Sequence, residues 1–170
     1  DWVLMDRMKS DDLYFYDVNA KVNFQPSKKN RYYLSFYNGA DNYTQGERFG
    51  LNWGNTAFSA RWNHLWSDKL FSNTVVYSSK YDYYMYYSKK DDAYWNSAIS
   101  VAGFKQDYSY YAHATTTIDF GLSGEYCVYS PGLFGENTKL LFPWISDITE
   151  KQSLESALHA NVEQRIFKKL

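Results

Sequence analysis

The feature that most constrains how this chain can fold is a strict alternation of apolar and polar side chains. From position 14 to position 24, the even residues are aromatic or aliphatic, whereas the odd residues from Asp17 to Asn23 are polar or charged. Side chains of a β-strand point alternately to its two faces, so this segment is predicted to be a strand with one apolar face. The alternation recurs at positions 31–40, 55–66, 71–83, 97–111, 116–129 and 154–163.

Two details of this pattern add to the expected strands. In the segment 97–111, Ile99 fits one phase of the alternation and Phe104 fits the other, which predicts a β-bulge near Gly103. Partial strands are also expected at positions 2–8 and from Ile166 onward.

The connections between the expected strands alternate in length. Short polar connections lie at 25–30, 67–69, 112–115 and 164–165, and longer ones at 41–48, 84–96 and 130–153. Outer-membrane barrels have this order, with short periplasmic turns and long extracellular loops. The expected strands of roughly 10–12 residues also approach the length of about 9–11 that crosses a bilayer at a tilt. Strands of soluble proteins are most often about 5–6 residues long.

The polar faces of the strands favour a wet interior over a dry core. Asp17, Asn19, Lys21 and Asn23 form a continuous polar stripe, while the opposite stripe has aromatic ends and an aliphatic centre. An aliphatic band between aromatic girdles is typical of barrel strands that face lipid. The predicted fold class is therefore all-β: an antiparallel transmembrane β-barrel portion of about seven to eight strands, spanning residues 1–170 as one segment. A soluble antiparallel sheet rich in tyrosine is the alternative.

Composition excludes several other classes of protein. The net charge of −1 argues against a nucleic-acid partner, which would need a basic surface. The single Cys127 excludes an intrachain disulfide framework. No apolar run approaches 18 residues, which argues against a membrane-spanning helix, whereas an alternating strand is hidden from such a count.

The residues that carry the alternation also resemble a known family in their order and spacing. They are similar to the barrel of outer-membrane TonB-dependent receptors of the Bacteroidetes type, over the middle part of that barrel. The resemblance extends from about Leu13 to Glu163. The matching segments are 14–23, 31–41, 53–55, 61–64, 68–73, 105–111 and 120–121.

The resemblance implies properties that the pattern alone does not give. Such receptors have a barrel of about 22 strands, an N-terminal plug domain and a periplasmic box that contacts a TonB-type energy transducer. The sequence given contains neither plug nor box, and it ends at Lys168-Lys169-Leu170 without a terminal aromatic residue. We therefore expect a fragment of a larger barrel in the bacterial outer membrane, with the lipid bilayer, the plug domain and the transducer as partners.

The sequence offers no catalytic motif, and neither an enzyme nor a cofactor is expected. His64, His113 and His159 are scattered without the spacing of a metal site. The candidates for ligand contact are aromatic residues, because aromatic rings stack on flat or apolar ligands. These candidates are Tyr83, Tyr84, Tyr86, Tyr87, Tyr94, Trp95 and Trp144. An interface girdle that continues above the membrane is the alternative for all but Trp144.

The segment 130–153 is too apolar for a solvated tether, since it contains Leu140, Phe142, Trp144 and Ile148. We expect it on the extracellular side. There it would fold back onto neighbouring loops or into the barrel mouth, or contact a capping partner such as a surface lipoprotein.

Three functions are consistent with the sequence. The first is part of an outer-membrane TonB-dependent active transporter that imports a substrate. The alternatives are a small eight-stranded outer-membrane barrel with a structural or adhesive role, and a soluble carbohydrate-binding β protein.

Overall fold

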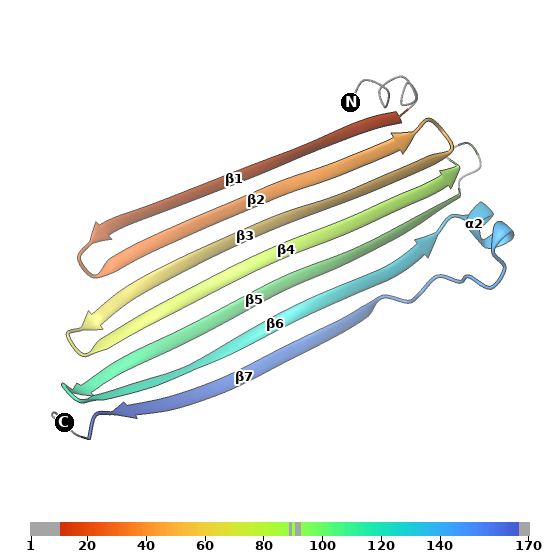
Figure 1. Cartoon of the computed structure of the whole chain (residues 1–170). Helices are drawn as coiled ribbons and strands as arrows, with labels where there is room; N and C mark the ends of the chain where they lie inside the picture. The colour runs from red at the N-terminus through yellow and green to blue at the C-terminus, as the bar shows by residue number, and fades with distance from the viewer. Residues whose placement is uncertain (1–10, 89, 91–92, 167–170) are drawn as a thin grey trace.

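Seven antiparallel strands joined in sequence order form one sheet (Figure 1). The computed structural model describes residues 11–88, 90 and 93–166. The strands are β1 (Asp11–Ser27), β2 (Asn30–Gln45), β3 (Phe49–Ser67), β4 (Leu70–Ser88), β5 (Ala93–His113), β6 (Thr116–Phe134) and β7 (Lys151–Gln164). A six-residue helix, α2 (Glu136–Leu141), is the only helix in this described part. The expected all-β antiparallel fold is confirmed.

The strands are longer than the alternation predicts. They contain between 14 residues in β7 and 21 residues in β5. Most of the additional length lies at the ends opposite the short turns, where the expected loops 41–48 and 84–96 are largely strand. Backbone pairing continues there although the apolar side chains of β2 to β4 change from the even to the odd positions. The partial strand expected at 2–8 lies outside the described residues, and Ile166 is not in a strand.

Short turns join the strands at one end of the sheet. Two residues separate β1 from β2, β3 from β4, and β5 from β6. In the first two turns a serine hydroxyl accepts a backbone N–H: Ser27 Oγ from Lys29 at 3.3 Å, and Ser67 Oγ from Lys69 at 3.2 Å. Such serine turns fix the chain reversal locally. We call the half of the sheet nearer these turns the turn-side half.

The opposite end carries the other connections. Between β2 and β3 the turn is short, with Gly46 at a φ of 53°, a conformation that glycine adopts without steric cost. Between β6 and β7 lies the longest described connection, which contains α2. We call this half the loop-side half. One row of paired residues divides the halves: Asn19, Tyr37, Ala57, Ser79, Val101, Cys127 and Ser153.

Register determines which side chains share a face. Val22 pairs with Leu34, Leu34 with Ala60, and so on, so that even residues face even residues through the body of the sheet. Paired residues point to the same side. The sheet therefore has an even face and an odd face, each continuous from β1 to β7.

The bulge expected near Gly103 is absent. Ala102 pairs with Ser78 and Tyr126, and Gly103 pairs with Tyr77 and Glu125, without a shift of register on either side. The change of phase in the sequence is instead a change in which face of β5 is apolar.

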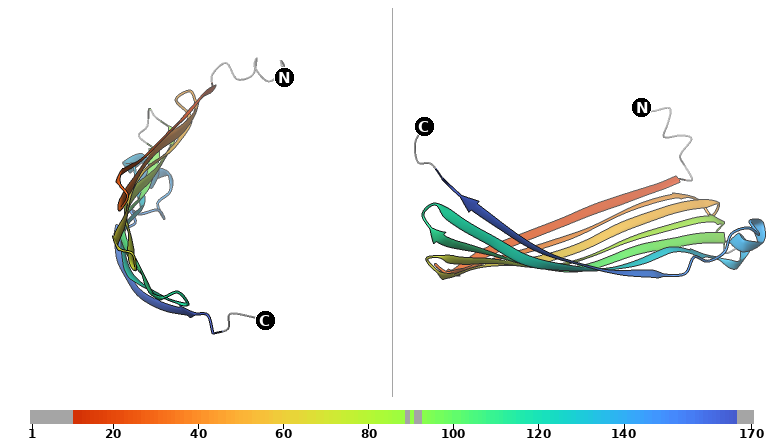
Figure 2. Two further views of the ribbon diagram at one scale, coloured as in Figure 1. Left: turned by 90° about the vertical axis from the view of Figure 1, so that its left-hand side faces the viewer. Right: turned by 90° about the horizontal axis from the view of Figure 1, so that it is seen from below.

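The sheet is one curved layer (Figure 2). Leu65 donates its backbone N–H to Lys29 O, so the odd residues of β3 direct their backbone groups toward β2. The chirality of L-residues then determines on which side of the sheet these side chains lie, given the direction in which β3 runs in Figure 1. That side is the concave side of the curved layer in Figure 2. The even face is then convex.

No second layer covers either face in the described part of the chain. Among its hydrophobic residues only Tyr86, Ala93 and Cys127 are buried. Within the described ranges no helix is long and apolar enough to cross a membrane.

Candidate functional site

The even face carries an exposed apolar band in the turn-side half. Large apolar side chains on all seven strands remain accessible, from about 39% for Phe104 to 84% for Leu158. We call this set the apolar band: Val22, Phe24, Leu34, Phe36, Phe58, Val76, Phe104, Tyr110, Phe120, Leu122, Tyr126, Leu154, Leu158 and Val162. Among the described strand residues, the even face bears no Asp, Glu, Lys or Arg in this half.

Aromatic rings border the apolar band beside the short turns. Phe24 stacks on Tyr32 with ring centroids 5.0 Å apart, and Tyr32 stacks on Trp62 at 6.2 Å. The indole N–H of Trp62 donates to Asn30 Oδ1 at 3.0 Å. Each ring thus presents an apolar body while the indole nitrogen has a polar partner, as at a membrane–water interface.

The odd face is polar in the same half. Tyr77 donates its hydroxyl to Glu125 at 2.5 Å across the intervening strand, over Gly103. A Cβ on Gly103 would stand 2.1 Å from the ring of Tyr77, so the glycine makes room for this ring. Ser109 donates to Asp119 at 2.6 Å. The polar stripe expected on β1 belongs to this face.

Polarity reverses in the loop-side half. There the even face of β2 to β5 carries amides, small residues and an ion pair of 2.9 Å between Lys80 and Asp82. The odd face becomes apolar and aromatic, with Tyr43, Leu51, Trp53, Tyr81, Tyr83, Met85 and Trp95. Register thus puts the aromatic odd positions of 71–83 on the opposite face of the sheet from the apolar even positions of β1.

The seven candidate residues do not form one site. All except Trp144 lie in strands β4 and β5 rather than in a loop. Tyr83 and Trp95 share the odd face, with ring centroids 5.6 Å apart. Tyr84 and Tyr94 share the even face, also at 5.6 Å.

Tyr86 has a structural role. It is buried, it covers Gly50 on β3, and its hydroxyl donates to Gly46 O at 3.0 Å. This leaves Tyr86 little surface for a ligand.

Three of the candidates, Tyr87, Trp95 and Trp144, line one cavity of about 430 Å³ at the loop end of the sheet. We call it the aromatic pocket. Its other lining residues are Phe134, Thr138, Phe142 and Ile145. Trp144 is 79% exposed, so its ring is available to a ligand. No pattern in the sequence predicts the role of Thr138, because its position depends on how the connection folds.

The connection after β6 folds back to build this pocket, as the composition of 130–153 predicts. Gly135 N–H and Thr138 Oγ1 both donate to Tyr94 O at 3.0 Å, which fixes α2 on β5. The ring of Phe142 lies between those of Tyr87 and Trp144, with centroid distances of 6.3 Å to Tyr87 and 5.6 Å to Trp144.

An ion pair closes the same connection. Lys139 Nζ lies 2.6 Å from Asp147 Oδ2, and Asp147 Oδ1 accepts the backbone N–H of Phe134 at 2.9 Å. The bond from Lys139, followed by that from Phe134, lowers the pKa of the Asp147 carboxyl. The carboxylate thereby links the loop to the end of β6.

The chemistry of the aromatic pocket is that of binding. Among the described residues that line it, Tyr87 alone is titratable, and apart from Thr138 the others are aromatic or aliphatic. Such a lining suits an apolar or flat group held by stacking. Within the described ranges, no three His, Cys, Asp or Glu residues are grouped to hold a metal ion.

No family model matches the chain, and no curated protein matches it either.

Proposed function

We propose that this chain is part of the barrel of an outer-membrane active transporter of the TonB-dependent type, located in the bacterial outer membrane. The observation that carries the proposal is the apolar band: an exposed apolar surface across seven strands, on a single layer of sheet. Monomeric soluble proteins rarely expose apolar patches larger than about 300–600 Å². Lipid is the environment that stabilises such a surface.

Strand length supports the same proposal. Strands of 14 to 21 residues are roughly 45–70 Å long at about 3.3 Å per residue. About 9–11 residues cross the hydrocarbon core at a tilt. The remaining length corresponds to the loop-side half, where the even face of β2 to β5 loses its apolar character, as expected for strands that extend into water.

The odd face supports a solvated interior. Its turn-side half holds charged and hydrogen-bonded side chains such as Glu125 and Asp119. In a closed barrel these groups would face the lumen, and the aromatic pocket would lie at its outer mouth. Substrate captured there would then pass inward.

Energy coupling belongs to other parts of the protein. The resemblance in order and spacing supports a plug domain and a periplasmic box that contacts a TonB-type transducer. A surface lipoprotein is a further proposed partner, with the exposed connection around Trp144 as its contact.

The test begins with the reading frame that flanks this segment. A signal peptide and a plug domain upstream would support the transporter. A complete frame of about eight strands would favour the small structural or adhesive barrel.

Localisation separates both barrels from the soluble alternative. The full-length protein is expected in the outer-membrane fraction, with faster gel migration before heating than after. Recovery as a monodisperse protein without detergent would contradict the proposal and favour the soluble carbohydrate-binding protein.

A further inference from the structure

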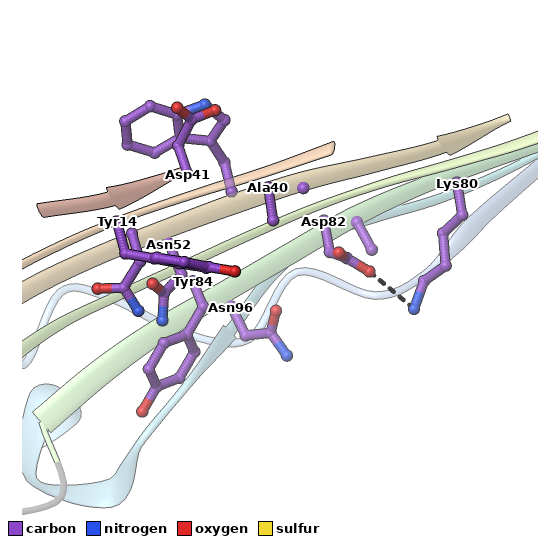
Figure 3. A pocket seen from close by; sticks show the side chains of 12 residues that line it. Tyr14, Ala40, Asp41, Asn52, Lys80, Asp82, Tyr84 and Asn96 are labelled. Carbon is purple, nitrogen blue, oxygen red and sulfur yellow. Dashed lines mark ion pairs between the residues drawn. The ribbon is translucent and has the colours of Figure 1, made fainter. Parts of the chain in front are cut away.

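A second depression lies on the even face of the loop-side half, and the proposed transport role does not use it (Figure 3). We call it the polar groove. Its volume is about 500 Å³, within the range of about 300–1,000 Å³ for small-ligand sites. Tyr14, Asn52, Tyr84 and Asn96 project from one side of the sheet there, whereas Asp41 projects from the other (Figure 3).

The groove is built from two neighbouring rows of the ladder. In the first row Tyr14, Asn42, Asn52, Tyr84 and Asn96 pair in succession across β1 to β5. Two phenol rings and three amides are thereby placed side by side on one face. Amides offer both donors and acceptors, and phenol rings offer an apolar face with a hydroxyl at its edge.

The second row forms a low floor. Ala40, Gly54, Asp82 and Ala98 pair in succession, and three of these side chains are a methyl group or a hydrogen. A flat ring can therefore approach the backbone closely. A Cβ on Gly54 would find its nearest atoms at 3.4 Å, so this glycine is not required by packing of the sheet.

Two polar features indicate what the groove accepts. Asn52 Oδ1 is shielded from water and has no hydrogen-bond partner among the described residues, which leaves an acceptor that a ligand hydroxyl can satisfy after a small rotation of the amide. Lys80 and Asp82 form an ion pair at 2.9 Å, and Asp41, the third charged residue of the lining, projects from the other side of the sheet (Figure 3), so the even face of the groove presents no unpaired charge.

We propose that the polar groove binds a neutral sugar ring. Such a ring has hydroxyls that donate to and accept from the amides, and a C–H face that packs on a phenol ring. Two sources of this chemistry exist, a free sugar and the sugar headgroup of a glycolipid. Only the second source depends on the proposed function, since the acyl chains would then lie along the neighbouring apolar band.

The experiment uses the full-length protein that contains this chain, purified in a detergent without sugar groups. Calorimetric titrations with maltose, lactose and chitobiose test free sugars. Micelles containing digalactosyl diacylglycerol, compared with phosphatidylcholine, test the glycolipid. Gly54→Val fills the floor, and Asn96→Ala removes an exposed amide without creating a buried cavity. Each variant is expected to weaken sugar binding at least tenfold.

Gly124→Val is the matched control. Gly124 also lies on the even face, and the nearest atom to its added Cβ is Glu155 O at 3.8 Å, but it is remote from the groove. It should leave sugar affinity unchanged. Binding of a free sugar that both groove variants weaken supports the proposal, and binding of the glycolipid alone with the same loss identifies the lipid source.

The proposal is overturned if no probe binds, or if both groove variants bind as the unmodified protein does. Failure of the membrane proposal has a separate signature. The protein would then be absent from the outer membrane while its binding of free sugar persisted.

Discussion

The turn-side and loop-side halves of this sheet share the same seven strands and differ in their side chains. In the turn-side half the even face is apolar and the odd face polar, as Leu122 and Glu125 illustrate on β6. In the loop-side half of β2 to β5 the order reverses, with Lys80 on the even face and Tyr81 on the odd face of β4. The backbone ladder passes through this reversal without interruption.

The alternation of apolar and polar residues therefore indicates the surroundings of a strand and not its length. A strand needs only paired backbone groups, which every residue type except proline supplies. A strictly apolar stripe is needed only where the outside is lipid. The position at which the stripe ends therefore marks the proposed boundary between membrane and water.

The largest difference between the two halves is expected when one charge is placed in each environment. Leu122→Arg puts a cation in the middle of the apolar band, and we expect it to reduce the free energy of unfolding by about 2–4 kcal/mol. The measurement is equilibrium folding of the full-length protein into vesicles.

Two variants on other surfaces are the controls. Ala157→Arg lies on the odd face of β7, opposite Ser123 and two residues from Glu155, and Asn96→Arg lies on the even face of the loop-side half, opposite Tyr84. Both should change stability by about 0.5 kcal/mol or less. An equal loss of unfolding free energy in all three variants would show that the apolar band does not differ in its surroundings from the other surfaces.

Packing on the odd face gives the next largest effect. Gly103→Ala forces the ring of Tyr77 away and breaks its hydrogen bond with Glu125, which should cost about 1–3 kcal/mol. Gly124→Ala, which meets no close atom, should cost much less. If Tyr77→Ala does not reduce the cost of Gly103→Ala, this contact is not the cause.

The sequence predicted the fold better than it predicted the site. Alternation gave the seven strands and the short turns, because local side-chain chemistry carries that information. It failed at Gly103, where a change of face imitates a bulge, and in the candidate tyrosines, which split between the two faces. Only register, which depends on pairing between distant segments, shows that Tyr84 and Tyr83 belong to different surfaces.

The aromatic pocket predicts a difference in ligand binding between the loop end and the short-turn end of the sheet. Trp144→Ala removes an exposed ring and should weaken binding of the transported substrate by about 0.5–1.5 kcal/mol, while barrel assembly stays intact. Deletion of residues 140–148 should weaken binding further. Trp66→Ala at the short-turn end is the control, and an equal loss there would show that the pocket is not involved.

The smallest expected effect concerns pH. Because the pKa of Asp147 is lowered in the folded connection, its stabilising bonds are complete above the unfolded pKa of about 3.9 and are lost as pH falls through the folded value. Hydrogen exchange at the amide of Phe134, corrected for intrinsic rates, should show protection that decreases on acidification. In Asp147→Asn this pH dependence should disappear, and its persistence would assign the effect to another group.

The most direct test of the central claim is the environment of successive residues along one strand. In the full-length protein with Cys127→Ser, single nitroxide labels at positions 118 to 120 and 122 to 124 of β6 are measured in lipid vesicles for collision with oxygen and with a water-soluble nickel complex. Position 121 is left unlabelled, because a side chain on Gly121 would collide with the backbone of β5. The expected result is a period of two, with labels at 118, 120, 122 and 124 accessible to oxygen and those at 119 and 123 accessible to nickel. Equal access of nickel to both sets, or the opposite phase, would contradict it.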